Sequence, residues 1–184
     1  MLKNNYKYLP IALTLLILSA CAGTEVIQQN RSERINPGSL IIAFPFRDPS
    51  LFEKKFPGIG GKFTQSFTAA ASKYNIDIIP VSSDVFRSDQ DLDVFTALEF
   101  AKEKNADYIV IGHVTKWVDR ATEWSGKRDY AGLGISIRAL NTGKIVATGE
   151  FEEYSNGLWS GTPDDFIVSL SQSAAEHFFG PEGK

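Results

Sequence analysis

The residues with the greatest potential for binding or chemistry lie together in residues 117–129. Two tryptophans, Trp117 and Trp124, stand here among acidic and basic side chains in equal number. Because tryptophan and arginine are enriched at binding hot spots, we predict a recognition surface in this stretch. Its residues are Trp117, Asp119, Arg120, Glu123, Trp124 and Arg128. The alternative is a structural role, in which ion pairs and stacking of Arg120 on Trp124 tie a hairpin or loop to a sheet.

The other candidates for catalysis do not form a set. His113 and His177 are the only histidines, and neither belongs to a ligand spacing such as H-x-x-x-H. No G-x-S-x-G motif occurs, and Cys21 is the single cysteine. We therefore predict no catalytic residue. A hydrolase acting on cell-wall or lipid substrates is an alternative, but the sequence offers it only unpaired carboxylates such as Glu123.

Two further patterns resemble ligand sites, but each lacks a required residue. Asp89, Asp91 and Asp93 have the spacing of a calcium loop, yet Val94 stands where such a loop needs glycine. Residues 58–62 are rich in glycine and could present N–H groups to an anion, but they lack the spacing of a phosphate loop. Helix capping and a helix start explain both patterns. We predict no metal, and no cofactor apart from covalent lipid.

The first twenty residues have the pattern of a secretory signal peptide. Lys3 and Lys7 precede an apolar run that is too short to span a bilayer, which takes ~20 residues. Residues 18–21 read Leu-Ser-Ala-Cys and fit the bacterial lipobox. We predict that residues 1–20 are removed and that Cys21 carries diacylglycerol and an N-acyl chain such as palmitate, which together make anchoring stable.

The residue after this cysteine is Ala22 rather than aspartate. This resembles the sorting signal of Gram-negative lipoproteins that go to the outer membrane. We therefore expect the periplasmic face of the outer membrane as the location, with the lipid anchor as the contact to the membrane.

The charge balance argues against nucleic acid as a partner. The whole chain has a formal net charge of −3, and removal of Lys3 and Lys7 with the signal peptide changes it to −5. Nucleic-acid binding asks for a basic face. The remaining chain is long enough for one core. We expect a flexible tether over residues 21–38, which are mostly polar and end in Asn36-Pro37-Gly38, and a single domain over residues 39–180.

The domain has the hydrophobic pattern of an α/β fold with an α+β tendency. Short apolar runs alternate with helical patterns and are followed by a hairpin and a last helix, in the order βαβαβ-ββ-α. The expected strands are residues 40–44, 76–81, 107–114, 132–140 and 144–153. The expected helices are residues 62–74, a segment from Ser88 or Asp89 to about Asn105, and a segment from Pro163 to just before Gly180. We predict one mixed sheet of about five strands with three helices.

The sequence D-R-A-T-E-W-S-G at residues 119–126 resembles a signature of an uncharacterised family of bacterial lipoproteins. Such proteins have a lipobox, a tether and one α/β domain of unknown function. The element order is also similar to small α/β envelope domains of the Tol-translocation and curli-secretion types, which bind partners or assemble. The resemblance implies a non-catalytic binding or assembly domain, with an envelope protein or a second copy of the chain as its partner. The alternative it leaves open is a structural subunit of a ring or other envelope complex.

Overall fold

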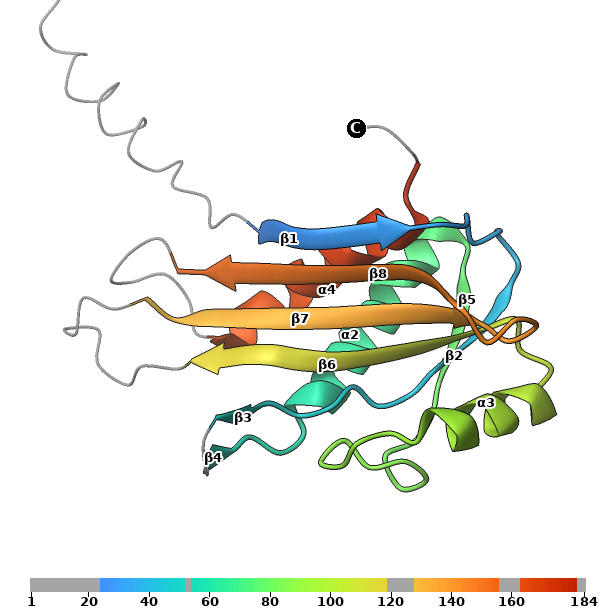
Figure 1. Cartoon of the computed structure of the whole chain (residues 1–184). Helices are drawn as coiled ribbons and strands as arrows, with labels where there is room; N and C mark the ends of the chain where they lie inside the picture. Colours follow the sequence, from blue (N-terminus) through green and yellow to red (C-terminus); the bar gives the residue numbers. More distant parts are fainter. Residues whose placement is uncertain (1–23, 52–53, 119–127, 156–162, 182–184) are drawn as a thin grey trace, which may run out of the picture.

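A computed structural model describes residues 24–51, 54–118, 128–155 and 163–181 and shows one six-stranded mixed sheet with helices on both faces (Figure 1). The strands, in spatial order, are β1 (Thr24–Arg31), β8 (Ile145–Tyr154), β7 (Tyr130–Ala139), β6 (Tyr108–Val118), β2 (Leu40–Ala43) and β5 (Asp77–Pro80). The α-helices of the described residues are α2 (Ile59–Ala71), α3 (Val94–Glu103) and α4 (Phe166–Phe179). None of them is both long and apolar enough to cross a membrane.

Short elements complete the fold. The strands β3 (Ser50–Leu51) and β4 (Lys54–Lys55) form a separate two-stranded sheet, and turns of 3-10 helix cover Ser72–Tyr74 and Pro163–Asp165. The predicted α/β class, with three helices and one mixed sheet, is confirmed, although the main sheet has one strand more than expected.

The two halves of the sheet differ in the direction of strand pairing. β2 pairs in parallel with β5 and β6, so α2 and α3 serve as the crossovers that parallel neighbours require. From β6 onward the chain turns back on itself, and β6, β7 and β8 pair antiparallel. The change from continuous apolar runs to strict alternation in the sequence marks this boundary, since an antiparallel strand can leave one face uncovered.

The main core lies between the sheet and the helices α2 and α4. Alternate residues of β7, such as Leu133 and Ile137, face these helices and are fully buried. Phenylalanines fill the space between the layers: the Phe67 and Phe178 rings meet edge to face with centroids 6.4 Å apart, and Phe151 of β8 packs on Phe178 at 6.0 Å. Edge-to-face pairs of this kind favour one packing arrangement over others.

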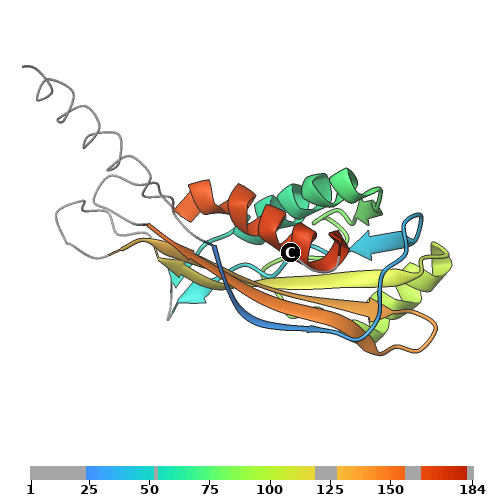
Figure 2. The same ribbon diagram turned by 90° about the horizontal axis from the view of Figure 1, so that it is seen from above.

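The opposite face of the sheet is covered only at one end. Helix α3 contributes Ala97 and Ala101 to a small cluster with Ile42, Phe44 and Ile109. Figure 2 shows α2 and α4 on one side of the sheet and α3 on the other side, near β6 and the short parallel strands. Among the described residues, therefore, no helix covers the outer face of β1, β8 and β7.

The structure corrects the expected tether. Residues 24–31, predicted to be part of a flexible segment, form β1 and pair antiparallel with β8 from Thr24↔Glu153 to Arg31↔Ala147. Ile35 also belongs to the main core, with 3% of its surface exposed. Glu153 is buried beside this strand and accepts hydrogen bonds from Thr24 Oγ1 at 3.1 Å and from Ser169 Oγ. The folded part of the chain therefore begins before residue 39.

Helix α2 begins earlier than the expected residue 62 because a distant carboxylate caps it. Asp48 accepts hydrogen bonds from the backbone N–H groups of Gly58 at 3.0 Å and Gly60 at 2.7 Å. The glycine-rich segment thus presents its N–H groups to an anion, as helix N-termini do, but the anion is a side chain of the same protein. Helix α3 is likewise capped by Asp93, which accepts from the N–H groups of Phe95 and Thr96.

Candidate functional site

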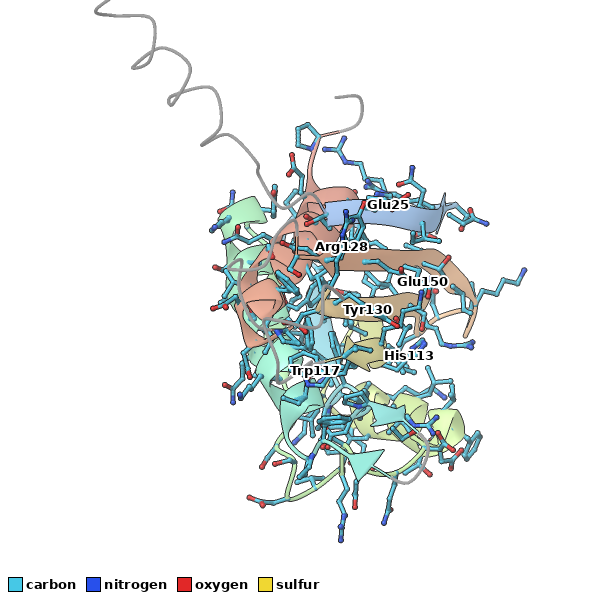
Figure 3. All side chains as sticks on the ribbon, turned by 90° about the vertical axis from the view of Figure 1, so that its left-hand side faces the viewer. Glu25, His113, Trp117, Arg128, Tyr130 and Glu150 are labelled. Carbon is cyan, nitrogen blue, oxygen red and sulfur yellow. The ribbon has the colours of Figure 1, made fainter. Side chains whose placement is uncertain are left out.

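Trp117 contributes to the core and not to an exposed surface. Only 5% of its surface is exposed, and its ring meets Phe63 of α2 edge to face, with centroids 6.2 Å apart. Figure 3 shows it at the end of the sheet where β6 finishes. For this tryptophan the burial and the ring contact fit the structural alternative, and its role in recognition stays a prediction.

Arg128 is exposed at the start of the returning chain. Its guanidinium carbon lies 5.2 Å from the centroid of the Tyr154 ring, within the range of a cation–π contact. Next to it, Asp129 and Ser155 exchange hydrogen bonds and join the ends of β7 and β8. The remaining predicted residues, Asp119, Arg120, Glu123 and Trp124, lie outside the described residues, so the recognition surface stays a prediction.

The uncovered sheet face has a shallow depression of about 240 Å³ across β6, β7 and β8. It is lined by Ile111, His113, Gly134, Ile135, Ser136, Thr148, Gly149 and Glu150. Gly134 stands opposite His113 in the register, and a Cβ at this position would lie 2.5 Å from Cε1 of the imidazole. The glycine therefore lets the ring lie directly against the backbone of β7. His113 and Glu150 lie on the same side of the sheet in Figure 3.

Ion pairs surround this depression. Lys116 Nζ pairs with Glu152 across β7, and Arg47 pairs with Asp91 at 2.5 Å. The hydrogen bond to Glu152 raises the pKa of Lys116. Because the Arg47–Asp91 pair is largely exposed, it contributes little to stability, whereas Glu152 of the other pair is mostly covered. The outer face is thus polar and mixed in charge, which suits contact with another macromolecule better than enclosure of a small apolar ligand.

The two histidines do not form a joint site, because they lie on opposite faces of the sheet. His113 is on the outer face, whereas His177 of α4 packs on the inner face beside the Phe178 ring at 5.0 Å. Burial lowers the pKa of His113, with Glu150 opposing and Arg47 reinforcing the effect. Burial and then the charge of Arg31 lower the pKa of His177.

These directions predict a pH dependence of stability. An unfolded histidine has a pKa of about 6.5, and both folded values lie below it, so the unfolded state binds more protons as the pH falls through this region. The free energy of unfolding is therefore expected to be highest at pH values above about 6.5 and to decrease as the pH is lowered from there. Urea unfolding of wild type and of the His113→Gln/His177→Gln double variant, at neutral and mildly acidic pH, measures this. An equally large loss in the double variant would assign the effect to other groups.

A second and larger cleft lies on the helix side, between β1 and the C-terminal end of α4, with a volume of about 630 Å³. Arg31, Arg34 and His177 are among its lining residues. The sequence did not indicate this cleft, because its two arginines fall in the segment expected to be a tether. The helical stripe of α4 and a strand assignment for residues 24–31 together would have brought them to one place.

No protein-family model and no curated protein matches the sequence. Among solved structures, the fold is similar to that of the PelC dodecamer from Paraburkholderia phytofirmans, with a TM-score of 0.67 and 15% identity over 87% of this chain and 100% of that chain. It is also similar to lipoprotein GNA1162 from Neisseria meningitidis, with a TM-score of 0.50 and 12% identity over 76% of this chain and 96% of that chain. At these identities the similarity concerns the fold.

Proposed function

We propose that this chain is an outer-membrane lipoprotein, anchored through lipid on Cys21, whose α/β domain assembles with copies of itself and catalyses no reaction. The observation that supports this most is the fold. It matches the full length of a protein that forms a dodecamer, and most of a second protein that is a lipoprotein. Assembly also gives the uncovered outer sheet face and the edge strand β1 a partner.

Strand β1 has the properties of an edge that pairs or packs. It lies at the border of the sheet, with β8 as its neighbour. Val26 and Ile27 expose 44% and 48% of their surface. The register shifts between Val26 and Gln28, which places an irregularity at Ile27. Because a bulge limits backbone pairing at a sheet edge, it is the exposed side chains of Val26 and Ile27 that support contact between subunits.

The anchor would hold one end of the sheet near the bilayer. Cys21 precedes Thr24, the first residue of β1, by three positions, and three residues span at most about 11 Å. The same end of the sheet carries the pairs Thr24↔Glu153 and Tyr130↔Tyr154. A lipid on Cys21 thus restricts how far this end of the domain can stand from the membrane, so neighbouring copies would share a common orientation.

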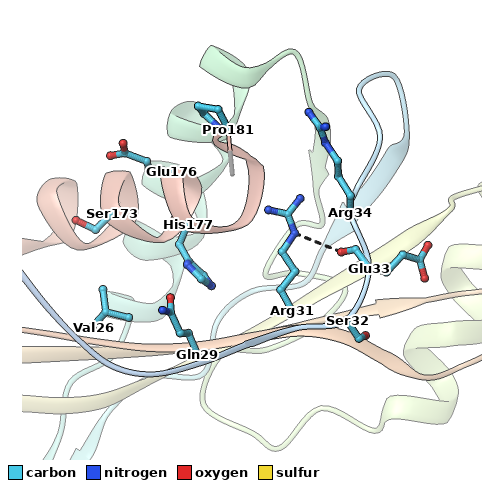
Figure 4. A pocket seen from close by; sticks show the side chains of 10 residues that line it. All are labelled: Val26, Gln29, Arg31, Ser32, Glu33, Arg34, Ser173, Glu176, His177 and Pro181. Carbon is cyan, nitrogen blue, oxygen red and sulfur yellow. Dashed lines mark hydrogen bonds between the residues drawn. The ribbon is translucent and has the colours of Figure 1, made fainter. Parts of the chain in front are cut away.

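The described clefts favour binding over catalysis. Glu150 is the only carboxylate among the residues that line the outer-face depression. In the cleft beside α4, the Glu33 carboxylate accepts a hydrogen bond from the Tyr108 hydroxyl at 3.0 Å. The Glu176 side chain points away from the Glu33 side chain in Figure 4. A hydrolase would need two cooperating carboxylates or a nucleophile with its base. Ser173 and His177 both line the cleft beside α4, but among the described residues no hydrogen bond joins them.

The test is amine-directed cross-linking in intact envelopes. The expected result is a ladder of bands above the dimer for the wild-type lipoprotein at its natural expression level. The matched control is a monomeric envelope lipoprotein in the same sample, which should give no ladder. Bands of the single chain alone, at cross-linker levels that capture known envelope oligomers, would contradict self-assembly. A single discrete band that contains another protein would instead indicate a heterologous partner and would contradict it as well.

A further inference from the structure

The cleft between β1 and the end of α4 gathers cationic and polar groups from both elements, and several of them are only partly satisfied by hydrogen bonds among the described residues. Its volume is about 630 Å³, and both elements contribute to its walls. Figure 4 shows Arg31, Gln29 and Val26 rising from β1, with His177 and Ser173 descending from α4. The other lining residues are Ser32, Glu33, Arg34, Glu176 and Pro181.

Neither arginine of the cleft is neutralised by an ion pair among the described residues, and Arg31 is also oriented by a hydrogen bond. Arg31 donates through Nε to the backbone oxygen of Glu33 at 3.3 Å, which orients its guanidinium and leaves the terminal nitrogens without a partner among the described residues. Within the same residues, neither Arg31 nor Arg34 has an ion pair. In Figure 4 both guanidiniums extend toward the C-terminal end of α4, near Pro181, while the Glu33 carboxylate points the other way.

The two arginines also do not cap the C-terminal end of α4. The last turn of α4 has a partial negative charge that an arginine could neutralise by donating to its carbonyl groups. The hydrogen bond that closes this turn is instead a backbone one, from Gly180 N to Glu176 O at 2.7 Å. Among the described residues neither arginine donates to a carbonyl of this turn. The terminal N–H groups of both guanidiniums therefore remain available to a ligand.

The floor of the cleft holds a buried group that lacks a hydrogen bond. Nε2 of His177 is inaccessible to solvent and has no partner among the described residues. Buried polar atoms in proteins are nearly always paired, so this nitrogen is an unmet hydrogen-bonding group in the wall of the cleft, and the imidazole reports on changes beside it. In Figure 4 the imidazole points toward Gln29 of β1.

We propose that this cleft binds the oxyanion of a small soluble ligand, a carboxylate or a phosphate, between Arg31 and Arg34, with the rest of the ligand directed toward Gln29 and His177. Guanidinium forks hold such groups through two parallel hydrogen bonds. The apolar side chain of Val26 and the hydroxyl of Ser173 border the same space. A ligand with one anionic group and neighbouring hydroxyls, such as an acidic sugar, offers acceptors to the arginines and hydrogen-bonding groups to Gln29 and Ser173.

The two histidines allow a direct test, because the chain contains no others. Full-length lipoprotein in an uncharged detergent, labelled in its histidines, is titrated with galacturonate or inorganic phosphate at constant ionic strength. Binding is expected to shift the His177 resonances and to raise its pKa, since a bound anion offsets the charge of Arg31. His113, on the other face of the sheet, serves as the internal reference and should not respond.

Variants that each remove one positive charge make the test specific. Arg31→Gln and Arg34→Gln are each expected to weaken binding about tenfold or more, as loss of a charge-assisted hydrogen bond does. Arg87→Gln is the matched control, because Arg87 is paired with Asp89 in an exposed loop and its loss changes the net charge equally. Anionic vesicles form a further arm. A His177 response to phosphatidylglycerol vesicles without one to either soluble anion would contradict a soluble ligand.

The proposal also fails under other results. A complete absence of a His177 response at high millimolar anion, or equal weakening by the Arg31, Arg34 and Arg87 variants, would mean that no built site exists. Equal responses of His177 and His113 would indicate a general effect of anions on the protein. None of these outcomes depends on whether the lipoprotein self-assembles.

Discussion

Gly60→Ala is expected to destabilise the domain by about 3 kcal/mol or more and to lower its melting temperature by roughly 10 °C. A Cβ at this position would lie 1.8 Å from the carbonyl oxygen of Phe46 and 2.6 Å from its carbonyl carbon. Both contacts are with backbone, so a change of side-chain conformation cannot relieve them. The first turn of α2 would have to move away from the extended segment around Phe46, which follows β2 in the chain.

Hydrogen bonds oppose this movement. Phe46 N donates to Thr64 Oγ1 at 2.8 Å, and the same hydroxyl donates to Gly60 O at 2.9 Å. Asp48 accepts from Gly60 N at 2.7 Å. A shift of α2 would weaken these bonds as well as the packing of Phe63 and Phe67 behind them, so the cost exceeds that of one steric contact.

Gly61→Ala is the matched control for this substitution. A Cβ at Gly61 would meet no atom within 4 Å. Alanine is favoured over glycine inside a helix by about 1 kcal/mol, so this variant should melt at or slightly above the wild-type temperature. Thermal unfolding followed by circular dichroism compares the three proteins. A Gly60→Ala variant as stable as Gly61→Ala would show that α2 does not pack against Phe46 as described.

Cys21→Ser is expected to abolish membrane anchoring. A serine hydroxyl is not a nucleophile comparable with a thiolate, so no diacylglycerol would be attached and the lipoprotein peptidase would leave the precursor uncut. Without several acyl chains the residual affinity for the bilayer falls to that of the signal segment alone. The expected result is therefore a complete loss of the mature acylated protein.

Fractionation of cells labelled with a palmitate analogue measures this outcome. Wild type should appear as a labelled, shortened protein in the outer-membrane fraction, and the variant as an unlabelled precursor of full length. Ala22→Ser leaves the cysteine in place and is the control for changes near the cleavage site. Normal labelling and retention of the Cys21→Ser protein would rule out the lipid anchor.

The sequence was sufficient for the elements whose apolar pattern is periodic. The alternation of Leu133, Ile135 and Ile137 with small or polar residues predicted β7, and these three side chains are buried as expected. The βαβ order also followed from the apolar runs, because parallel strands are covered on both faces. These features depend on local pattern alone.

Strand β1 was missed because its pattern is set by its position at the edge. Its residues are mostly polar, and only Val26 and Ile27 are large and apolar, each about half exposed. Pairing with β8 holds it in place, and a single sequence does not reveal a partner more than a hundred residues away. The start of α2 was missed for a related reason, since its cap, Asp48, lies ten residues before Gly58.

The candidate sites show the same limit. Concentration of tryptophan and charge drew attention to residues 117–129, yet Trp117 proved to be a core residue that packs on Phe63. The cleft that holds Arg31, Arg34 and His177 required β1 to be recognised first, because only the strand brings the arginines beside α4. Sites built from two distant elements need the tertiary structure.

The measurement that tests the proposed function most directly is the mass of the full-length lipoprotein in detergent, by light scattering with the detergent contribution subtracted. We predict a discrete species with several times the mass of one chain, which persists on dilution across the micromolar range. The Cys21→Ser protein, purified in parallel, shows whether the lipid contributes to this assembly. A wild-type lipoprotein that has the mass of a single chain at every concentration would contradict the proposal.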